Sequence, residues 1–454
     1  MLNDDISRFD SKNRRILIEL IAILNHFSSK EKGLVQIEKV NFIKRLNLEY
    51  LNDVFLSPAG RQWIYISYSA IKGDEKSKDL LINYSNWAGI EYSNLKHYLI
   101  RKLDEFLFSL LILSGQPPDF SLSLEVKNSI LHFNNSLWKS NDIASIDINL
   151  GTTIKITTEK ENLTLAVIKE NKKLEYTFFK LPESDKFPFY IDLFSEASRA
   201  NFPGREHLPR VPYKDKKTIT QQVTKIEKAL EFIKESNASI YDYFINTKNY
   251  FVPLFGPEGA LPSSSNSTVD TMFWYSITDQ ALLISEMIIH ELSHQRLFRL
   301  QDEDPLIDPV YHNSGWEKCE LYSPWRDDPR PINGVFHGFI VFSEVAKFWL
   351  ELIKNADINE QEKNIAKRRM AMLTLQLSNA KESLDNAHFT SKGKEFYNQY
   401  VQYLNNDTLK YVLENNLGDL KPFFMEFHDQ EELAGQSIYE VVDEHKNHWL
   451  TNNI

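Results

Sequence analysis

The sequence predicts an α+β protein that is mostly helical and carries a small antiparallel β-meander. Three observations lead to this prediction. Apolar residues recur at three- and four-residue intervals over most of the chain, they alternate with polar residues between positions 141 and 200, and Gly, Pro and Ser gather where the period changes. With 454 residues, of which 42% are hydrophobic and 25% charged, the chain is long enough for a substantial core and for more than one domain.

The first expected unit, residues 1–140, is a helical N-terminal region. Residues 14–27 and 95–113 show helical periodicity, and Gly115, Pro117 and Pro118 stop the second run.

The second expected unit, residues 141–200, is the β-meander. Residues 146–157, 163–168 and 174–180 alternate apolar with polar side chains and are rich in Ile, Thr, Val and Tyr. Polar turns separate these segments. We expect this unit, together with the helical region before it, to bind part of a peptide.

The third expected unit, residues 201–454, is a mostly helical catalytic domain. Residues 218–236 predict a helix, residues 272–277 a strand and residues 281–300 a second helix, and helical periodicity dominates again from residue 332 to the end.

Charge and cysteine content narrow the classes of protein. A net charge of −11 argues against nucleic acid as a partner, because nucleic-acid binding requires clustered Lys and Arg. The single Cys319 leaves no internal disulfide, which indicates a reducing compartment. No secretory signal and no membrane-spanning stretch is visible, so we expect a cytoplasmic protein; its oligomeric state is not indicated.

The segment that carries chemistry is His290-Glu291-Leu292-Ser293-His294, an HExxH motif within the predicted helix 281–300. Residues four apart lie on one face of a helix, so the two imidazoles can converge on one ion, as on the metal-binding helix of zincins. Glu291 points about 100° away from His290 and is expected to act as a general base or to orient a ligand, without binding the ion.

Two histidines do not complete a metal site, so a third ligand must come from another segment. The best candidates are His337 and, as an alternative, Glu344. They lie seven residues apart in a strongly apolar stretch, where a buried polar group needs a partner.

Between the motif and these candidates lies a segment, residues 322–331, with three prolines and two arginines, Arg326 and Arg330. It is either a rigid connector whose arginines pair with Asp327 or Asp328, or a recognition loop that presents a guanidinium to an acidic cosubstrate.

On these residues the sequence resembles the HExxH-containing peptide-modification proteins of ribosomal-peptide biosynthetic clusters. The resemblance covers residues 251–349 and is carried by the HExxH motif, by residues 322–334, by His337-Gly338 and by Phe348-Trp349. It implies an Fe(II)- and 2-oxoglutarate-dependent oxygenase that β-hydroxylates residues of a precursor peptide. His290, His294 and His337 would then bind iron, and Arg330 or Arg326 would bind the distal carboxylate of 2-oxoglutarate.

Two other interpretations stay open. The motif alone favours a zinc metallopeptidase, with Glu291 as base, His337 or Glu344 as third ligand, and residues 272–277 as an edge strand for an extended substrate. A peptide-binding scaffold with a degenerate metal site is the non-enzymatic alternative. Two arginines near the metal suit a dicarboxylate cosubstrate and have no obvious use in a peptidase.

Overall fold

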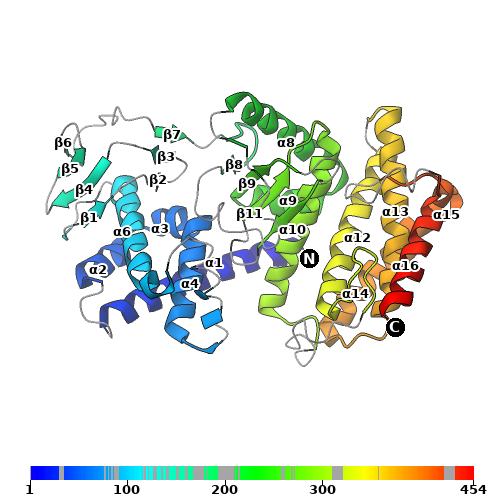
Figure 1. Cartoon of the computed structure of the whole chain (residues 1–454), viewed down its shortest axis with the longest axis horizontal. Helices are drawn as coiled ribbons and strands as arrows, with labels where there is room; N and C mark the ends of the chain where they lie inside the picture. Colours follow the sequence, from blue (N-terminus) through cyan, green and yellow to red (C-terminus); the bar gives the residue numbers. More distant parts are fainter. Residues whose placement is uncertain are drawn as a thin grey trace.

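The computed structural model is mostly helical, with three small sheets (Figure 1). It describes residues 2–29, 35–75, 78–79, 81–82, 85, 91–114, 116, 119–120, 122–125, 130–133, 136–139, 143–149, 153–158, 162–166, 178–180, 183–192, 209, 211–212, 215–256, 261–266, 269, 271–308, 321–355, 357–423 and 435–453. The α+β class predicted from the sequence is confirmed at this coarse level.

The N-terminal part is a group of helices around its own core. They are α1 (Leu2–Ser29), α2 (Ile37–Arg45), α3 (Leu48–Phe55), α4 (Pro58–Lys72), η1 (Tyr92–Asn94) and α6 (Leu95–Ser114). Phe55, Trp63 and Phe106 form its aromatic centre, with ring centroids 5.4 to 6.1 Å apart. The helices predicted at 14–27 and 95–113 are confirmed as parts of α1 and α6.

The predicted helical region extended to residue 140, and this is wrong, because helix ends at Ser114 and strands begin at Leu122. The strands are β1 (Leu122–Glu125), β2 (Ile130–Phe133), β3 (Ser136–Lys139), β4 (Ile143–Asn149), β5 (Thr153–Thr158), β6 (Asn162–Ala166) and β7 (Phe178–Lys180). Short strands bounded by polar residues carry too little periodicity to separate them from helix ends.

The described residues of 141–200 do not show the single meander predicted there, although β4, β5 and β6 pair in order as antiparallel neighbours. The predicted strand 146–157 is divided between β4 and β5, which pair with each other. β6 continues that sheet, in the order β1-β4-β5-β6, whereas β7 pairs with β3 in a separate sheet. Part of the third predicted strand, residues 174–177, lies outside the described residues.

A mixed sheet supports the segment that carries the HExxH motif. Its strands are β8 (Phe189–Ile191), β9 (Asn249–Leu254), β10 (Ser263–Ser265) and β11 (Met272–Ser276), in the order β10-β11-β9-β8. β8, β9 and β11 run parallel, and β10 is antiparallel to β11. The predicted strand at 272–277 is confirmed, but it lies inside the sheet, so the expectation of an edge strand there is wrong; β10 is at the edge.

Helices form most of the described part of the chain after residue 215 (Figure 1). They are α8 (Lys216–Ser236), α9 (Ala238–Ile245), α10 (Ala281–Glu303), α12 (Ile332–Asn355), α13 (Glu360–Leu384), α14 (Ser391–Tyr403), η4 (Leu404–Leu409), α15 (Lys410–Glu414), η5 (Leu417–Asp419) and α16 (Ile438–Asn453). α10 packs against α8 and α12, and α12 packs along α13, which in turn contacts α16. The predicted helices at 218–236 and 281–300 are confirmed as α8 and α10.

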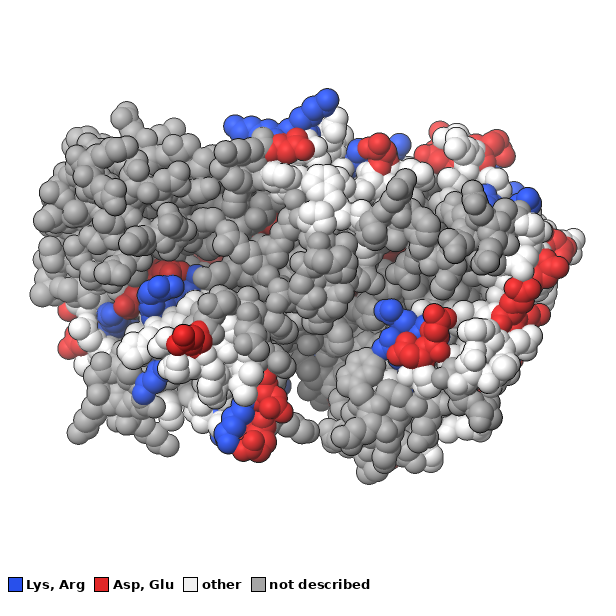
Figure 2. Space-filling view, in the orientation of Figure 1, with Lys and Arg blue, Asp and Glu red and all other residues white. Residues whose placement is uncertain are grey.

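The face shown in Figure 2 carries no single basic area among its described residues. Its Lys and Arg side chains lie beside Asp and Glu side chains, in keeping with the net charge of −11. In the described part of the chain, no helix is both long enough and apolar enough to cross a membrane.

Candidate functional site

A cavity of about 600 Å³ lies between α10, the segment before α12, α13 and α16, and both HExxH histidines line it. His290 and His294 are one helical turn apart on α10, so both side chains leave the helix on the same side. α10 is anchored in the core through buried side chains such as Ile289 and Leu292. The helix is therefore held rigidly, and only its histidine face meets the cavity.

The two imidazoles lie at a separation suited to one shared ion. Their ring centroids are 4.9 Å apart, with the ring planes at 71°. With metal–nitrogen distances of about 2.1 Å, two imidazoles on one tetrahedral ion have centroids roughly 5 Å apart. Burial lowers the pKa of His294 to about 4, so its ring is neutral and able to bind an ion at neutral pH.

Several buried polar atoms on this cavity wall have no hydrogen-bond partner within the described part of the chain. They are His294 Nδ1, Trp325 Nε1 and Gln376 Oε1, and all three residues line the cavity. Buried polar groups are almost always paired in folded proteins, so unpaired ones gathered around one cavity indicate that a ligand belongs there. A metal ligand also has an unpaired imidazole nitrogen before the ion binds. In this respect His290 and His294 fit a metal site.

Glu291 is almost fully buried and lies behind the cavity wall. Its Oε1 accepts a hydrogen bond of 2.6 Å from Ser263 Oγ of β10. Ser263 is one of the described residues that line the cavity, and Glu291 is not. The carboxylate thus reaches the cavity through a serine hydroxyl in this arrangement.

His337, the predicted third ligand, belongs to α12 and lies next to His294 of α10. Its ring stacks at 22° on that of His294, with centroids 5.8 Å apart, and its Nε2 is hydrogen-bonded to Gln301 Oε1 at 2.6 Å. His337 is buried and is not among the described residues that line the cavity. In the described residues, no three His, Cys, Asp or Glu side chains form a group able to hold one ion, so the third ligand stays a prediction.

Glu344, the alternative third ligand, is engaged elsewhere. Its carboxylate accepts hydrogen bonds from Tyr400 Oη at 2.7 Å and Asn237 Nδ2 at 3.1 Å, and Arg296 Nη1 lies 4.0 Å away. Burial raises the pKa of Glu344, but the positive charges of Arg296 and Lys347 and the two hydrogen bonds outweigh burial and lower it. The structure therefore gives Glu344 the role of a buried, paired carboxylate that joins α12 to α9 and α14.

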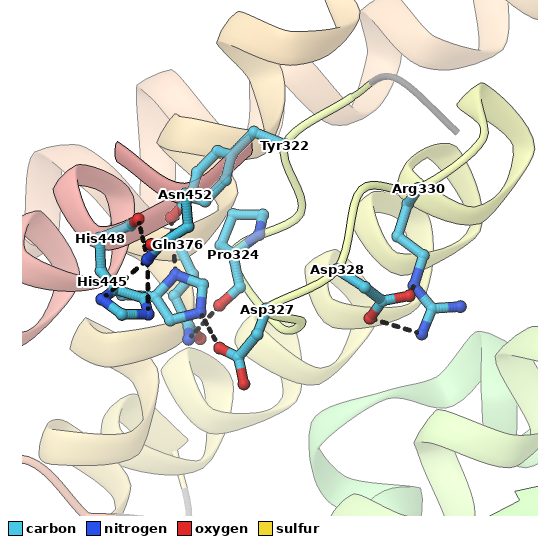
Figure 3. Close-up of polar contacts among 9 residues, drawn as sticks. All are labelled: Tyr322, Pro324, Asp327, Asp328, Arg330, Gln376, His445, His448 and Asn452. Atoms are coloured by element: carbon cyan, nitrogen blue, oxygen red, sulfur yellow. Dashed lines mark hydrogen bonds and ion pairs between the residues drawn. The ribbon is translucent and has the colours of Figure 1, made fainter. Parts of the chain in front are cut away.

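The predicted recognition segment forms a closed loop, residues 321–330, which we call the arginine loop (Figure 3). Two backbone hydrogen bonds between Leu321 and Arg330 close its base. Arg330 pairs with Asp328, with Nε 3.2 Å from Oδ2, which is the pairing expected of a rigid connector. Arg326 and Arg330 both line the cavity, as expected of a recognition loop.

An aromatic stack connects the arginine loop to the histidines. Trp325 stacks on Phe342 of α12, with centroids 4.6 Å apart, and Phe342 contacts His290 edge to face at 4.9 Å. Trp325 can lie this close because Gly338 has no side chain. A Cβ at position 338 would be 2.7 Å from Trp325 Cζ3.

We expect Gly338→Ala to lower the free energy of unfolding by about 1–3 kcal/mol, because the new methyl group displaces Trp325 from a packed position. Gly334→Ala on the same helix is the matched control, since its Cβ would meet its nearest neighbours at 3.7 Å, an ordinary contact. Urea unfolding of both variants measures the difference. Equal stability of the two would show that the loop does not pack on α12 as described.

Sequence reasoning missed two parts of the site. Glu286 and Arg369 line the cavity as a buried pair, with Arg369 Nη2 2.6 Å from Glu286 Oε1. Glu286 also accepts a hydrogen bond of 2.8 Å from Trp349 Nε1. Glu286 could have been found, because it lies four residues before His290; Arg369 and the α16 residue His445 carry no local signal.

Comparison with known proteins adds no family or relative. The chain matches no protein-family model, and no curated protein matches it.

Proposed function

We propose that this protein is an Fe(II)- and 2-oxoglutarate-dependent oxygenase that β-hydroxylates residues of a ribosomally synthesised precursor peptide. The observation that carries the proposal is that the two HExxH histidines and Arg326 line one cavity. An oxygenase of this class needs an imidazole-rich metal site and a cation for the distal carboxylate of its cosubstrate. A volume of about 600 Å³ is ample for a dicarboxylate beside a substrate side chain.

His290 and His294 would hold the iron, with His337 as the predicted third ligand. When bound, the iron supplies the redox chemistry and the coordination positions for the keto acid and dioxygen. The chain's own contribution is to hold the two imidazoles rigid on a buried helix and to keep that of His294 neutral. Phe342 packs against His290, and Trp325 stacks on Phe342, so this aromatic pair would limit the access of water to that side of the ring.

Arg326 is the cavity cation best placed to bind the distal carboxylate. Arg330 is paired with Asp328, and Arg369 with Glu286. Among the described residues, Arg326 has no ion pair and is exposed at the tip of the arginine loop. A guanidinium without a competing carboxylate gains most from an incoming dicarboxylate, so Arg326 is preferred to Arg330.

The peptide would approach along β10. This strand lies at the edge of the mixed sheet, and its Ser263 lines the cavity. An extended peptide can pair with such an edge and place one side chain in the cavity.

A zinc peptidase is the second candidate, favoured by the same edge strand. It would require Glu291 to act on water at the metal. The position of Glu291 behind Ser263 suits a residue that orients a ligand better than a general base.

Mass spectrometry of a precursor peptide co-expressed with the protein tests the proposal. A gain of one oxygen per modified residue, together with formation of succinate from 2-oxoglutarate, is the expected result. A shortened peptide and no succinate would establish the peptidase instead. The variant His294→Ala, purified in parallel, serves as the inactive control.

Replacement of Glu291 with Gln distinguishes the two candidates in a second way. For the oxygenase we expect an unchanged metal content and a turnover lowered by about 10- to 100-fold, the usual effect of losing a partner that orients a site. Ser263→Ala, which removes the hydroxyl bonded to Glu291, should have a smaller effect in the same direction. Complete loss of peptide turnover in Glu291→Gln, with metal retained, would favour the peptidase.

A further inference from the structure

Helix α16 forms one wall of the cavity, although it is far from the HExxH motif in the sequence. Val441, Val442 and His445 line the cavity together with the arginine loop. Contacts that do not involve the arginine loop hold α16 in place. Lys446 pairs with Glu382 of α13 at 2.6 Å, and the backbone N–H of Ile438 donates to the carbonyl of Leu420. α16 is therefore a fixed surface against which the loop can be held.

One side chain of α16 contacts the arginine loop at two points (Figure 3). Tyr322 Oη lies 2.9 Å from His445 Nδ1, across 123 residues of sequence, and His445 Nε2 lies 3.4 Å from Asp327 Oδ1. Trp449, one turn further along α16, packs edge to face on Tyr322 at 5.2 Å.

Tyr322 contacts His445 as a protonated phenol. Burial raises the pKa of Tyr322, and the negative charges of Asp443 and Glu382 raise it further. The phenol therefore keeps its proton and can either donate to Nδ1 of His445 or accept from it. The other ring nitrogen, Nε2, faces Asp327 Oδ1, so both ring nitrogens of His445 contact the loop.

The two contacts lie on either side of Arg326 in the sequence. Tyr322 precedes Arg326 by four residues, Asp327 follows it directly, and the N–H of Arg326 donates to the carbonyl of Ser323 at 3.2 Å. α13 adds one more attachment, from Gln376 Nε2 to the carbonyl of Pro324 at 3.2 Å. The backbone around Arg326 is thus restrained mainly by the contacts of Tyr322, Pro324 and Asp327 with α13 and α16.

We infer that α16 is a latch for the arginine loop and that His445 is a positioning residue, which holds Arg326 ready for a dicarboxylate at the cavity. The assignment of the dicarboxylate rests on the function proposed above, whereas the latch itself rests on the contacts of His445. A loop that is ordered before binding loses less entropy when the ligand arrives, so His445 should raise affinity without touching the ligand.

Limited trypsin digestion of the full-length protein tests the latch without metal or cosubstrate. Trypsin cuts after Arg326 only when the loop can leave its packed position, whereas Arg330 precedes a proline and resists cleavage. We expect His445→Ala to speed cleavage at Arg326 by about tenfold or more, as measured by mass spectrometry of the fragment 1–326. His448→Ala is the matched control, since His448 is on the same helix and its ring contacts Asn452 of that helix (Figure 3).

Equal cleavage rates for wild type and His445→Ala, or an equal increase in His448→Ala, would overturn the latch. If His445→Ala does not fold, Tyr322→Phe decides the matter, because it removes one hydrogen bond and keeps the ring against Trp449. Faster cleavage after Arg326 in that variant supports the latch, and an unchanged rate rejects it.

Calorimetric titration of 2-oxoglutarate into the Fe(II)-loaded protein without oxygen tests the consequence for binding. The dissociation constant should rise about tenfold in His445→Ala and stay unchanged in His448→Ala, while the metal content is the same in both. Failure of the wild type to bind 2-oxoglutarate would reject the proposed function and leave the digestion result as the test of the latch. Normal binding by His445→Ala would show that His445 does not position Arg326.

Discussion

Replacement of His290 or His294 with alanine is expected to remove bound metal and to lower kcat/KM for the peptide by about 10³-fold or more, since in the oxygenase proposed above all chemistry depends on the ion. Each variant leaves one imidazole on α10, which cannot hold an ion alone. The fold should survive, because α10 is held by buried side chains such as Ile289 and Leu292. Elemental analysis of the purified variants and their circular dichroism measure the two expectations separately.

His337→Ala is the informative companion to these variants. The His337 ring stacks on His294 and is hydrogen-bonded to Gln301. Its removal should lower the metal affinity by about 10- to 100-fold, the usual effect of losing a residue that supports a ligand. Metal loss as complete as in His294→Ala would instead assign His337 as the third ligand. Full metal content in both His290→Ala and His294→Ala would contradict the metal site itself.

Replacement of Arg326 with Gln is expected to raise the dissociation constant for 2-oxoglutarate by about 10- to 100-fold. A hydrogen bond to a charged group contributes about 1.5–3 kcal/mol, and each 1.4 kcal/mol is a factor of ten. Calorimetric titration of the metal-loaded protein measures the change. Arg45→Gln, at a half-exposed arginine on α2 that is paired with Asp119, is the control for loss of one positive charge.

Arg330→Gln tests whether the assignment of the anchor is correct. Because Arg330 is already paired with Asp328, its replacement should weaken binding less than that of Arg326. A larger effect at Arg330 would reverse the assignment, and no effect at either position would rule out the arginine loop as the cosubstrate site.

Long helices could be predicted from the sequence because their signal is local. The periodicity of residues 281–300 and 332–355 is carried by neighbouring turns, and α10 and α12 follow it. The short strands were less predictable. β10 consists of three serines, which have no strand preference, and its place at the sheet edge depends on its pairing with β11.

What the sequence by itself determined is the pair of histidines, since a spacing of four on a helix puts both rings on one face whatever surrounds them. Only the tertiary structure decided which charged side chains stay available to bind a ligand. Glu344 is paired by Tyr400 and Asn237, Arg330 by Asp328, and the loop around Arg326 is held by His445. Most of these partners come from distant segments, and the energy of a hydrogen bond or ion pair depends on distance in space, which spacing along the chain does not fix.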